Sequence, residues 1–126
     1  MEKKSTRSED LENARRWANE NLLNKKVYHN DIKDFIEFNR VGISHSIYAK
    51  TYDEKIEMIY STISIIKKST LCGIEKDKKG RQDIKAVYKF VSNWEYQGKE
   101  YFVYIIVREN RQGKFYYDHG IIKKKP

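Results

Sequence analysis

The sequence has few residues that could form covalent or metal cross-links. It contains one cysteine, Cys72, and three histidines among 126 residues. A single cysteine excludes an internal disulfide framework and a cysteine-rich zinc site, and the histidines have no short spacing of the kind that metal ligands show. We therefore expect no structural metal, and a reducing compartment such as the cytoplasm suffices for this chain.

Long apolar runs and glycine-rich loops are also missing. No segment approaches the roughly 20 apolar residues that span a bilayer, and no apolar run follows the charges of the first ten residues. The sequence therefore predicts a soluble chain without a membrane partner or a visible secretion signal. The six glycines are scattered, so a nucleotide cofactor has no support, and we expect no cofactor of any kind.

Positive charge is what the chain has in excess. Lys and Arg number 26 against 18 for Asp and Glu, which gives a formal net charge of +8. This excess favours a polyanionic partner, either RNA or another nucleic acid or an acidic protein, and charge alone does not choose between them. Ten tyrosines and five phenylalanines argue against disorder, because disordered chains are poor in aromatic residues.

The order of the patterns predicts one α+β domain over residues 8–122. A polar lead at residues 1–7, whose composition is compatible with disorder, precedes it, and a basic tail at residues 123–126 follows it. Ser8 can cap a first helix that continues to about residue 24, with an apolar stripe that starts at Leu11. Residues 26–29 and 33–38 flank a turn-prone pair and predict a short hairpin.

Asn39 is a good N-cap for a helix from residue 40 to residue 48, and isoleucines at helical spacing predict another helix over residues 53–68. From residue 70 the pattern changes to strands, which we place at residues 71–76, 84–95, 99–109 and 114–121. Their short connections predict a four-stranded antiparallel meander. The strand at residues 99–109 is apolar on both faces, so we expect it to be central.

Two histidines in basic, aromatic surroundings provide the clearest functional signal. His45 lies within the segment Phe38–Ser46, and His119 follows the run Phe115–Asp118. One imidazole can take the 2′-OH proton of RNA and a second can protonate the leaving 5′-oxygen, while cations stabilise the charged phosphorane. The alternative is that one histidine caps or packs against a helix, the other ends a strand, and the two never meet.

Further side chains are candidates for holding the phosphate. Arg40 and Arg108 can bind it bidentately, Lys85 offers a point charge, and Ser46 is a phosphate-binding candidate beside His45. Tyr117 could orient the phosphate or stack on a base, although most tyrosines of such a sheet belong to the core. The cations could also be ordinary solvated charges, and Asp118 could either fix a histidine tautomer or merely end a strand.

Several blocks in a fixed order resemble a known family. They include Leu23–Val27, Ile36–Ser46, Gly80 with Arg81, Tyr96–Val103, Val107–Glu109 and Gly113–His119. The chain resembles the third of the large polyvalent protein-associated domains of phage and mobile-element polyproteins, which are related to barnase, EndoU and RelE-like nucleases. The resemblance covers about residues 22–121. It implies helices preceding a four-stranded antiparallel sheet, and metal-independent RNA cleavage by a toxin or effector module, for which a cognate inhibitor protein is a possible partner.

The position of Ser44 departs from the family pattern, in which a basic residue often precedes the histidine. This departure favours a rival interpretation, a non-catalytic module of a larger phage polypeptide that binds nucleic acid or protein. The leading hypothesis from the sequence is an endoribonuclease-like domain that cleaves RNA by 2′-OH attack with His45 and His119.

Overall fold

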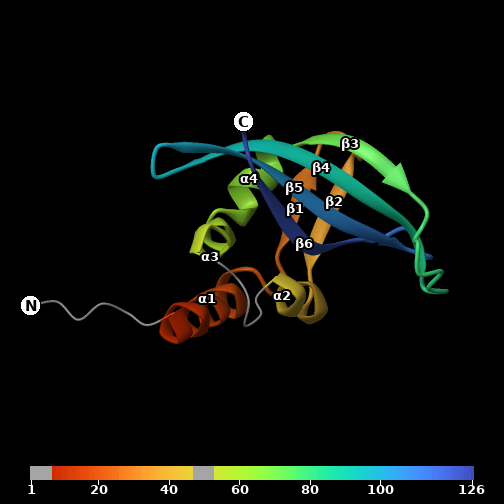
Figure 1. Cartoon of the computed structure of the whole chain (residues 1–126). Helices are drawn as coiled ribbons and strands as arrows, with labels where there is room; N and C mark the ends of the chain where they lie inside the picture. The colour runs from red at the N-terminus through yellow and green to blue at the C-terminus, as the bar shows by residue number, and fades with distance from the viewer. Residues whose placement is uncertain (1–6, 47–52) are drawn as a thin grey trace, which may run out of the picture.

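A computed structural model describes residues 7–46 and 53–126 of the chain (Figure 1). Helix α1 spans Arg7–Asn21 and begins one residue before the predicted cap, Ser8, while residues 1–6 of the polar lead lie outside the described residues. Glu9 and Asp10 occupy its first turn, where negative charge is favourable at the positive end of the helix dipole. Leu11, Ala14, Ala18 and Leu22 of the predicted stripe are buried as expected, and Trp17 packs against them partly buried.

The predicted hairpin is confirmed, with β1 at Lys26–His29 and β2 at Asp34–Phe38 paired antiparallel. The predicted sheet of four antiparallel strands is incomplete, because this hairpin adds two strands to it and makes the sheet mixed. Strand β2 pairs in parallel with β6, with Ile36 opposite Phe115 and Phe38 opposite Tyr117. An isolated hairpin is marginal in water, and joining the sheet buries Ile36 and Phe38 almost completely.

Three short helices follow the hairpin: α2 at Arg40–Ser46, α3 at Asp53–Tyr60 and α4 at Thr62–Lys68. The end of the helix predicted at residues 40–48 falls at residues 47 and 48, outside the described residues. The single helix predicted at residues 53–68 is broken at Ser61. Thr62 Oγ1 donates to the carbonyl oxygens of Met58 and Ile59 at 3.2 and 2.8 Å, a local side-chain bond that competes with the helix ladder.

The C-terminal strands are β3 at Thr70–Glu75, β4 at Ile84–Tyr96, β5 at Lys99–Asn110 and β6 at Phe115–Lys124. They pair antiparallel in sequence order, and β5 lies between β4 and β6 as predicted. Tight turns join the long strands, with Gly98 at φ 73° and Gly113 at φ 81°, a left-handed conformation that glycine adopts without steric cost. Strand β6 continues through Lys124, so the first two lysines of the predicted basic tail belong to the sheet.

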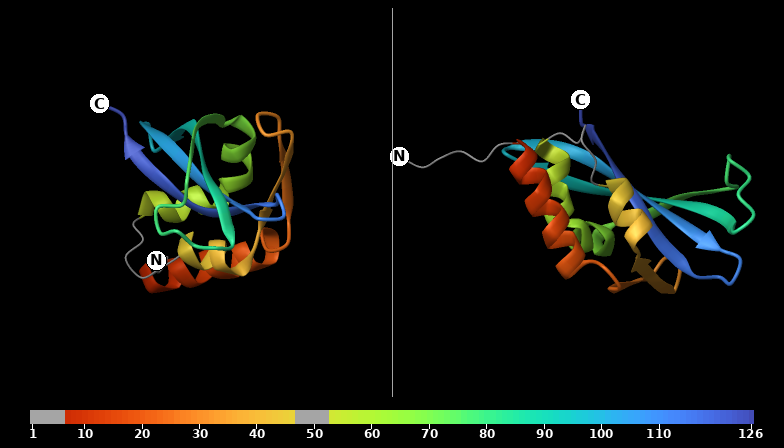
Figure 2. Two further views of the ribbon diagram at one scale, coloured as in Figure 1. Left: turned by 90° about the vertical axis from the view of Figure 1, so that its right-hand side faces the viewer. Right: turned by 90° about the horizontal axis from the view of Figure 1, so that it is seen from below.

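The six strands form one mixed sheet in the order β1-β2-β6-β5-β4-β3. Its core face packs against the helices: Leu11 and Ala14 of α1 share one apolar cluster with Met58, Ile66 and Ile105. Figure 1 shows α1 and α3 below the strands, and the right-hand view of Figure 2 shows α1, α2 and α3 in front of the sheet. No helix in the described part of the chain is long and apolar enough to cross a membrane.

The third histidine, His29, is a structural residue of the hairpin. It is 4% exposed, its ring lies 4.6 Å from that of Phe90, and its Nδ1 accepts a hydrogen bond from the backbone N–H of Asp31 at 3.1 Å. Since Nδ1 accepts, Nε2 carries the proton and donates to the Ser69 carbonyl oxygen at 3.0 Å. The Nδ1 bond therefore stays within the turn of the hairpin, and the Nε2 bond ties the hairpin to Ser69, directly after α4.

Candidate active site

Helix α2 reaches the edge of β6 because a glycine allows close contact. Asn39 caps the helix, with its Oδ1 accepting a hydrogen bond from the Gly42 N–H at 2.9 Å. A Cβ atom at Gly42 would lie 1.9 Å from the carbonyl oxygen of Tyr117, so only glycine fits at this distance. This approach brings His45, at the end of α2, beside β6.

A β-bulge in β6 gives the other half of the site. Ile106 of β5 pairs with His119 and Val107 pairs with Tyr117, which leaves Asp118 as the extra residue of the bulged strand. Neighbouring residues of a regular strand point to opposite faces, and a bulge changes the direction of a side chain locally. Here Asp118 and His119 contact each other, with His119 Nδ1 at 2.7 Å from Asp118 Oδ2.

Asp118 joins the two predicted histidines. Its Oδ1 lies 2.6 Å from Nδ1 of His45, and its Oδ2 binds Nδ1 of His119. The carboxylate can only accept, so Nδ1 of each ring carries a proton, and Nε2 is the nitrogen that remains for chemistry. The two rings are therefore joined through one carboxyl group, although His45 and His119 are 74 positions apart in the sequence.

Arg108 completes the cluster from β5. Its Nη2 donates to Asp118 Oδ1, the oxygen that also accepts from His45. The Arg108 Nη2 and His45 Nδ1 atoms lie 3.2 Å apart. Because both are donors, we attribute this contact to their shared acceptor and not to a hydrogen bond between them. We call His45, Arg108, Asp118 and His119 the histidine cluster.

The charge state of Asp118 follows from these contacts. Burial alone would raise its pKa, but the hydrogen bonds from His119, His45 and Arg108 outweigh burial and hold the pKa well below its usual value. Asp118 is therefore ionised at neutral pH, as the assignment of the two Nδ1 protons requires.

This shift predicts a pH-dependent effect of Asp118→Asn on stability. The folded pKa is lower than that of the unfolded chain, so the contribution of Asp118 is complete above the unfolded value of about 4 and decreases as the pH falls below it. We expect the variant to lose about 1.5–3 kcal/mol at pH 7, the scale of hydrogen bonds to a charged group.

Urea unfolding of wild type and variant between pH 7 and about pH 2 measures this difference. The difference in free energy of unfolding between the wild type and Asp118→Asn should become smaller as the pH falls. Asp83→Asn, which removes an exposed carboxyl group, controls for the loss of one negative charge. A gap that is the same at every pH would contradict the assigned role of Asp118.

The histidine cluster lines a cavity of about 450 Å³ that is rich in cations. Lys55 of α3 and Lys79 and Arg81 of the connection between β3 and β4 line it together with Arg108. Lys55 is 6% exposed, and burial lowers its pKa. The charged lining therefore matches an anion such as a phosphate group.

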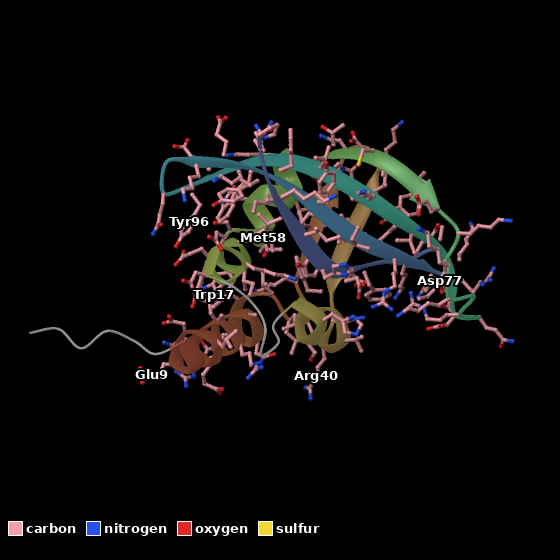
Figure 3. The ribbon with its side chains drawn as sticks, viewed as in Figure 1. Glu9, Trp17, Arg40, Met58, Asp77 and Tyr96 are labelled. Atoms are coloured by element: carbon pink, nitrogen blue, oxygen red, sulfur yellow. The ribbon has the colours of Figure 1, made fainter. Side chains whose placement is uncertain are left out.

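Arg81 is held in place by a neighbouring carboxylate. Its Nε and Nη2 donate to the two oxygens of Asp77 at 2.8 and 2.9 Å, a bidentate pair. The hydrogen bond to Arg81 is the main cause of the lowered pKa of Asp77. Figure 3 shows Asp77 at one end of the sheet, in the connection before β4, and Tyr96 at the other end of that strand.

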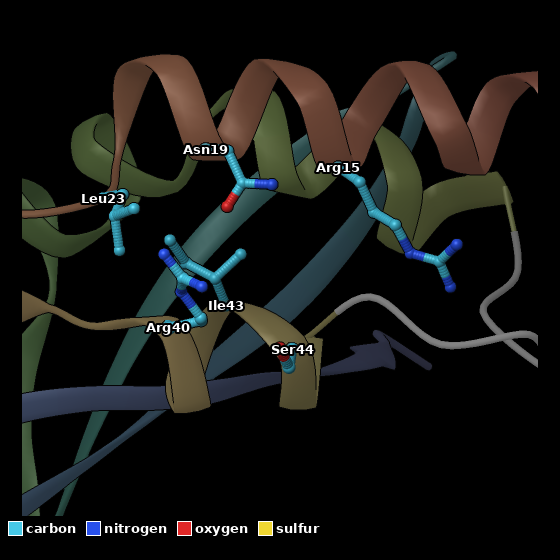
Figure 4. A pocket seen from close by; sticks show the side chains of 6 residues that line it. All are labelled: Arg15, Asn19, Leu23, Arg40, Ile43 and Ser44. Carbon is cyan, nitrogen blue, oxygen red and sulfur yellow. The ribbon is translucent and has the colours of Figure 1, made fainter.

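Arg40 does not join the histidine cluster. It lies with Arg15, Asn19 and Ser44 around a separate cavity of about 540 Å³ between α1 and α2 (Figure 4). Arg40 points toward α1 in that view, while His45 of the same helix faces β6. Ser44, where the family pattern has a basic residue, lies in this cavity and not in that of the histidine cluster.

The other predicted residues are also placed outside the histidine cluster. Lys85 is 59% exposed and lies 3.9 Å from a carboxylate oxygen of Glu109. Tyr117 is 2% exposed, and its ring packs 5.0 Å from that of Phe38, on the core face of the sheet. Ser46 ends α2, and its side chain lies outside the described part of the structure.

Sequence reasoning missed Lys55 and Arg81 and left Asp118 undecided. A signal for Lys55 was present, because Met58 and Ile59 follow it at the helical spacing of three and four residues and belong to the buried stripe. Arg81 belonged with Gly80 to a block of the family resemblance but received no role, since its position depends on how the connection before β4 folds. Within residues 7–46 and 53–126, no group of three or more His, Cys, Asp and Glu side chains is arranged to hold a metal ion.

Comparison with known proteins identifies the family. The family model of the large polyvalent protein-associated domain 3 matches residues 6–117, a range that includes His45 and Arg108 and ends one residue before Asp118. No curated protein and no solved structure shows significant similarity to the chain. The matched range extends from the start of α1 into β6 and thus includes most of the described fold. The chain therefore belongs to the large polyvalent protein-associated domain 3 family.

Proposed function

We propose that this domain is a metal-independent endoribonuclease, a toxin or effector module of a phage or mobile element, with the histidine cluster as its active site. The observation that carries the proposal is that one carboxylate, Asp118, binds Nδ1 of both His45 and His119. This leaves two Nε2 atoms for proton transfer beside a cation-rich cavity. A cognate inhibitor would need acidic groups to fill the same cavity.

The proposed reaction divides proton transfer between the two rings. Neutral His45 takes the proton of the ribose 2′-OH through Nε2, and the 2′-oxygen attacks the adjacent phosphorus. The bond from phosphorus to the 5′-oxygen breaks, and protonated His119 gives its Nε2 proton to that oxygen. The products are a 2′,3′-cyclic phosphate and a free 5′-hydroxyl, so atoms and charges balance without a further reactant.

The cations have a separate role in this reaction. Negative charge builds up on the non-bridging phosphate oxygens in the transition state, and fixed donors stabilise it at low reorganisation cost. Arg108 is 17% exposed and held by Asp118, and Arg81 is held by Asp77, so both are positioned in advance. Lys55 adds a third cation from α3.

The first test is cleavage of end-labelled single-stranded RNA by the purified wild-type protein in EDTA. The expected products carry 2′,3′-cyclic phosphate ends, which periodate and phosphatase treatment followed by gel mobility can identify. Absence of cleavage by folded protein on every RNA tried would contradict the proposal. Cleavage that needs a divalent cation would contradict the metal-independent mechanism.

Comparison of two arginines tests the position of the site. Arg108→Ala should reduce the cleavage rate by about 10²–10³-fold, the cost of losing one fixed donor to the developing charge. Arg40→Ala removes a cation of the separate cavity and should change the rate by no more than about threefold, an effect of net charge. Initial rates at saturating RNA measure both. Equal losses in the two variants would show that general charge, and not the histidine cluster, determines the activity.

A non-catalytic binding module is the second candidate. The same cavity could hold a phosphate group without cleaving it, and this is favoured by the exposure of His45, whose side chain is 49% accessible to water. Water around a general base weakens the control of proton transfer that an enclosed site provides. RNA binding without cleavage, lost in Arg108→Ala and retained in Arg40→Ala, would support this candidate.

A further inference from the structure

The face of the sheet opposite the helices has a regular arrangement across its three long strands. Residues directly opposite each other in neighbouring strands point to the same face. Three rows follow from the register of β4, β5 and β6: Lys89 with Ile106 and His119, Val91 with Tyr104 and Ile121, and Asn93 with Phe102 and Lys123. The residues between them in β5, Val103 and Ile105, are buried in the core, so these rows form the outer face.

The outer face leads into the cavity of the histidine cluster. Along β5 it presents Phe102, Tyr104, Ile106 and Arg108, and the last two line the cavity. From Phe102 to Arg108 there are six residue steps, and at about 3.3 Å per residue this part of the outer face is about 20 Å long. Beyond Phe102, the next row pairs Glu95 with Glu100. These two carboxylates repel a polyanion, so we expect a bound polyanion to extend along the outer face no farther than Phe102.

Lysines from neighbouring segments flank the aromatic rings along this face. Phe102 and Tyr104 are only partly buried. The Nζ atoms of Lys89 and Lys123 lie 4.6 and 5.7 Å from the ring centre of Tyr104, and that of Lys125 lies 4.8 Å from the ring centre of Phe102. Aromatic side chains flanked by flexible cations on an open sheet face are the arrangement that binds single-stranded nucleic acid.

We propose that this outer face binds a single-stranded segment of the RNA next to the scissile phosphate. This inference rests on the proposed function. Bases stack on Phe102 and Tyr104, and the lysines move from the rings to the phosphates between the bases. The exchange is favourable because a cation–π contact at an exposed site is weaker than stacking of a base, and the lysine keeps an anionic partner.

The geometry favours a single strand over a duplex or an acidic protein. The flat face of a ring can reach only a base that is not already stacked between base-paired neighbours. An acidic peptide would use the lysines equally well but would gain little from the rings. Binding that depends on the two aromatic side chains would therefore indicate RNA and not an acidic protein as the partner.

The test is fluorescence anisotropy with a labelled single-stranded RNA of about 10 nucleotides, a length typical of such sites. Its riboses carry 2′-O-methyl groups, so the protein cannot cleave it by 2′-OH attack. Replacing Phe102 and Tyr104 together with leucine keeps apolar bulk on the sheet but removes both rings. We expect binding to weaken by about tenfold or more. Phe35→Leu, at an exposed ring of the β1–β2 hairpin, is the aromatic control and should change binding by less than about twofold.

Two adjacent lysines provide the matched charge control. Lys123 belongs to the outer face, whereas Lys124 is the next residue of β6 and points to the opposite face. Lys123→Ala should reduce the slope of log affinity against log salt by about 0.7, the value for one phosphate contact of a single strand. Lys124→Ala should leave that slope nearly unchanged.

The outcomes separate this inference from the proposed function. If the variant without the Phe102 and Tyr104 rings loses RNA binding, this supports RNA binding by the outer face, even if the wild-type protein cleaves no RNA. Unchanged binding in that variant, or equal salt slopes for the two lysine variants, overturns it, even if the histidines cleave RNA. Polyglutamate that binds as tightly as the RNA and is insensitive to the loss of the two rings would also overturn it, in favour of an acidic protein partner.

Discussion

Replacing either His45 or His119 with alanine is expected to reduce the rate of RNA cleavage by about 10²–10⁴-fold, the usual contribution of one general acid or base. Asp118 binds Nδ1 of both rings, so each variant removes one Nε2 from the site and leaves the other histidine attached to the carboxylate. The double variant should be little slower than the slower single variant, because the two rings act in one reaction.

Glutamine variants at the same two positions separate chemistry from folding. A glutamine amide can donate a hydrogen bond to Asp118 but cannot transfer a proton near neutral pH. The dependence of kcat/KM on pH should be bell-shaped for the wild type, and each variant should lose the limb that belongs to the replaced ring. Thermal unfolding checks that the variants fold. If both alanine variants cleave within about threefold of the wild type, the histidine cluster is not the active site.

Gly42→Ala is expected to disrupt the site without changing any residue that would touch RNA. Alanine is favoured over glycine inside a helix by about 1 kcal/mol, so this substitution would stabilise α2 if space allowed. The added Cβ would instead lie 1.9 Å from the Tyr117 carbonyl oxygen, a backbone atom that cannot rotate away. We expect a net loss of about 1–3 kcal/mol in stability, as for other overpacked positions.

To relieve this contact, α2 must move away from β6, and this displacement should separate His45 from Asp118. A shift of about 1 Å can reduce activity by about 10²-fold, so we expect a loss of that order in the fraction of Gly42→Ala that remains folded. Gly73→Ala is the matched control, because the nearest contact of a Cβ there is an ordinary 4.0 Å to the Cβ of Lys89. Urea unfolding and RNA cleavage measure the two effects. A Gly42→Ala protein with wild-type stability and rate would show that α2 can move without consequence.

The local elements could be predicted from the sequence because their signals lie within a few residues of each other. The apolar stripe that starts at Leu11 predicts α1, and a run that is apolar on both faces predicts β5. Glycine turns such as that at Gly98 predict the antiparallel pairing of the last four strands. The helix break at Ser61 escaped prediction, since it depends on the hydrogen bonds that the Thr62 side chain makes.

The pairing of β2 with β6 could not be predicted, because nothing in the sequence near Ile36 indicates which distant strand will be its neighbour. The same holds for the histidine cluster. His45, Arg108 and His119 were candidates by residue type, and their convergence depends on three features of the tertiary structure. These are the parallel strand pair, the contact of α2 with β6 at Gly42, and the bulge at Asp118.

The amino-acid sequence by itself determined the residue types, the positive charge and the succession of helices and strands, since these follow from side-chain chemistry and short-range periodicity. Tertiary structure alone decided that Asp118 binds both histidines and that Arg40 lies elsewhere. The physical reason is that a bulge of one residue changes which side chains share a face, and only the complete packing of the sheet fixes where that bulge forms.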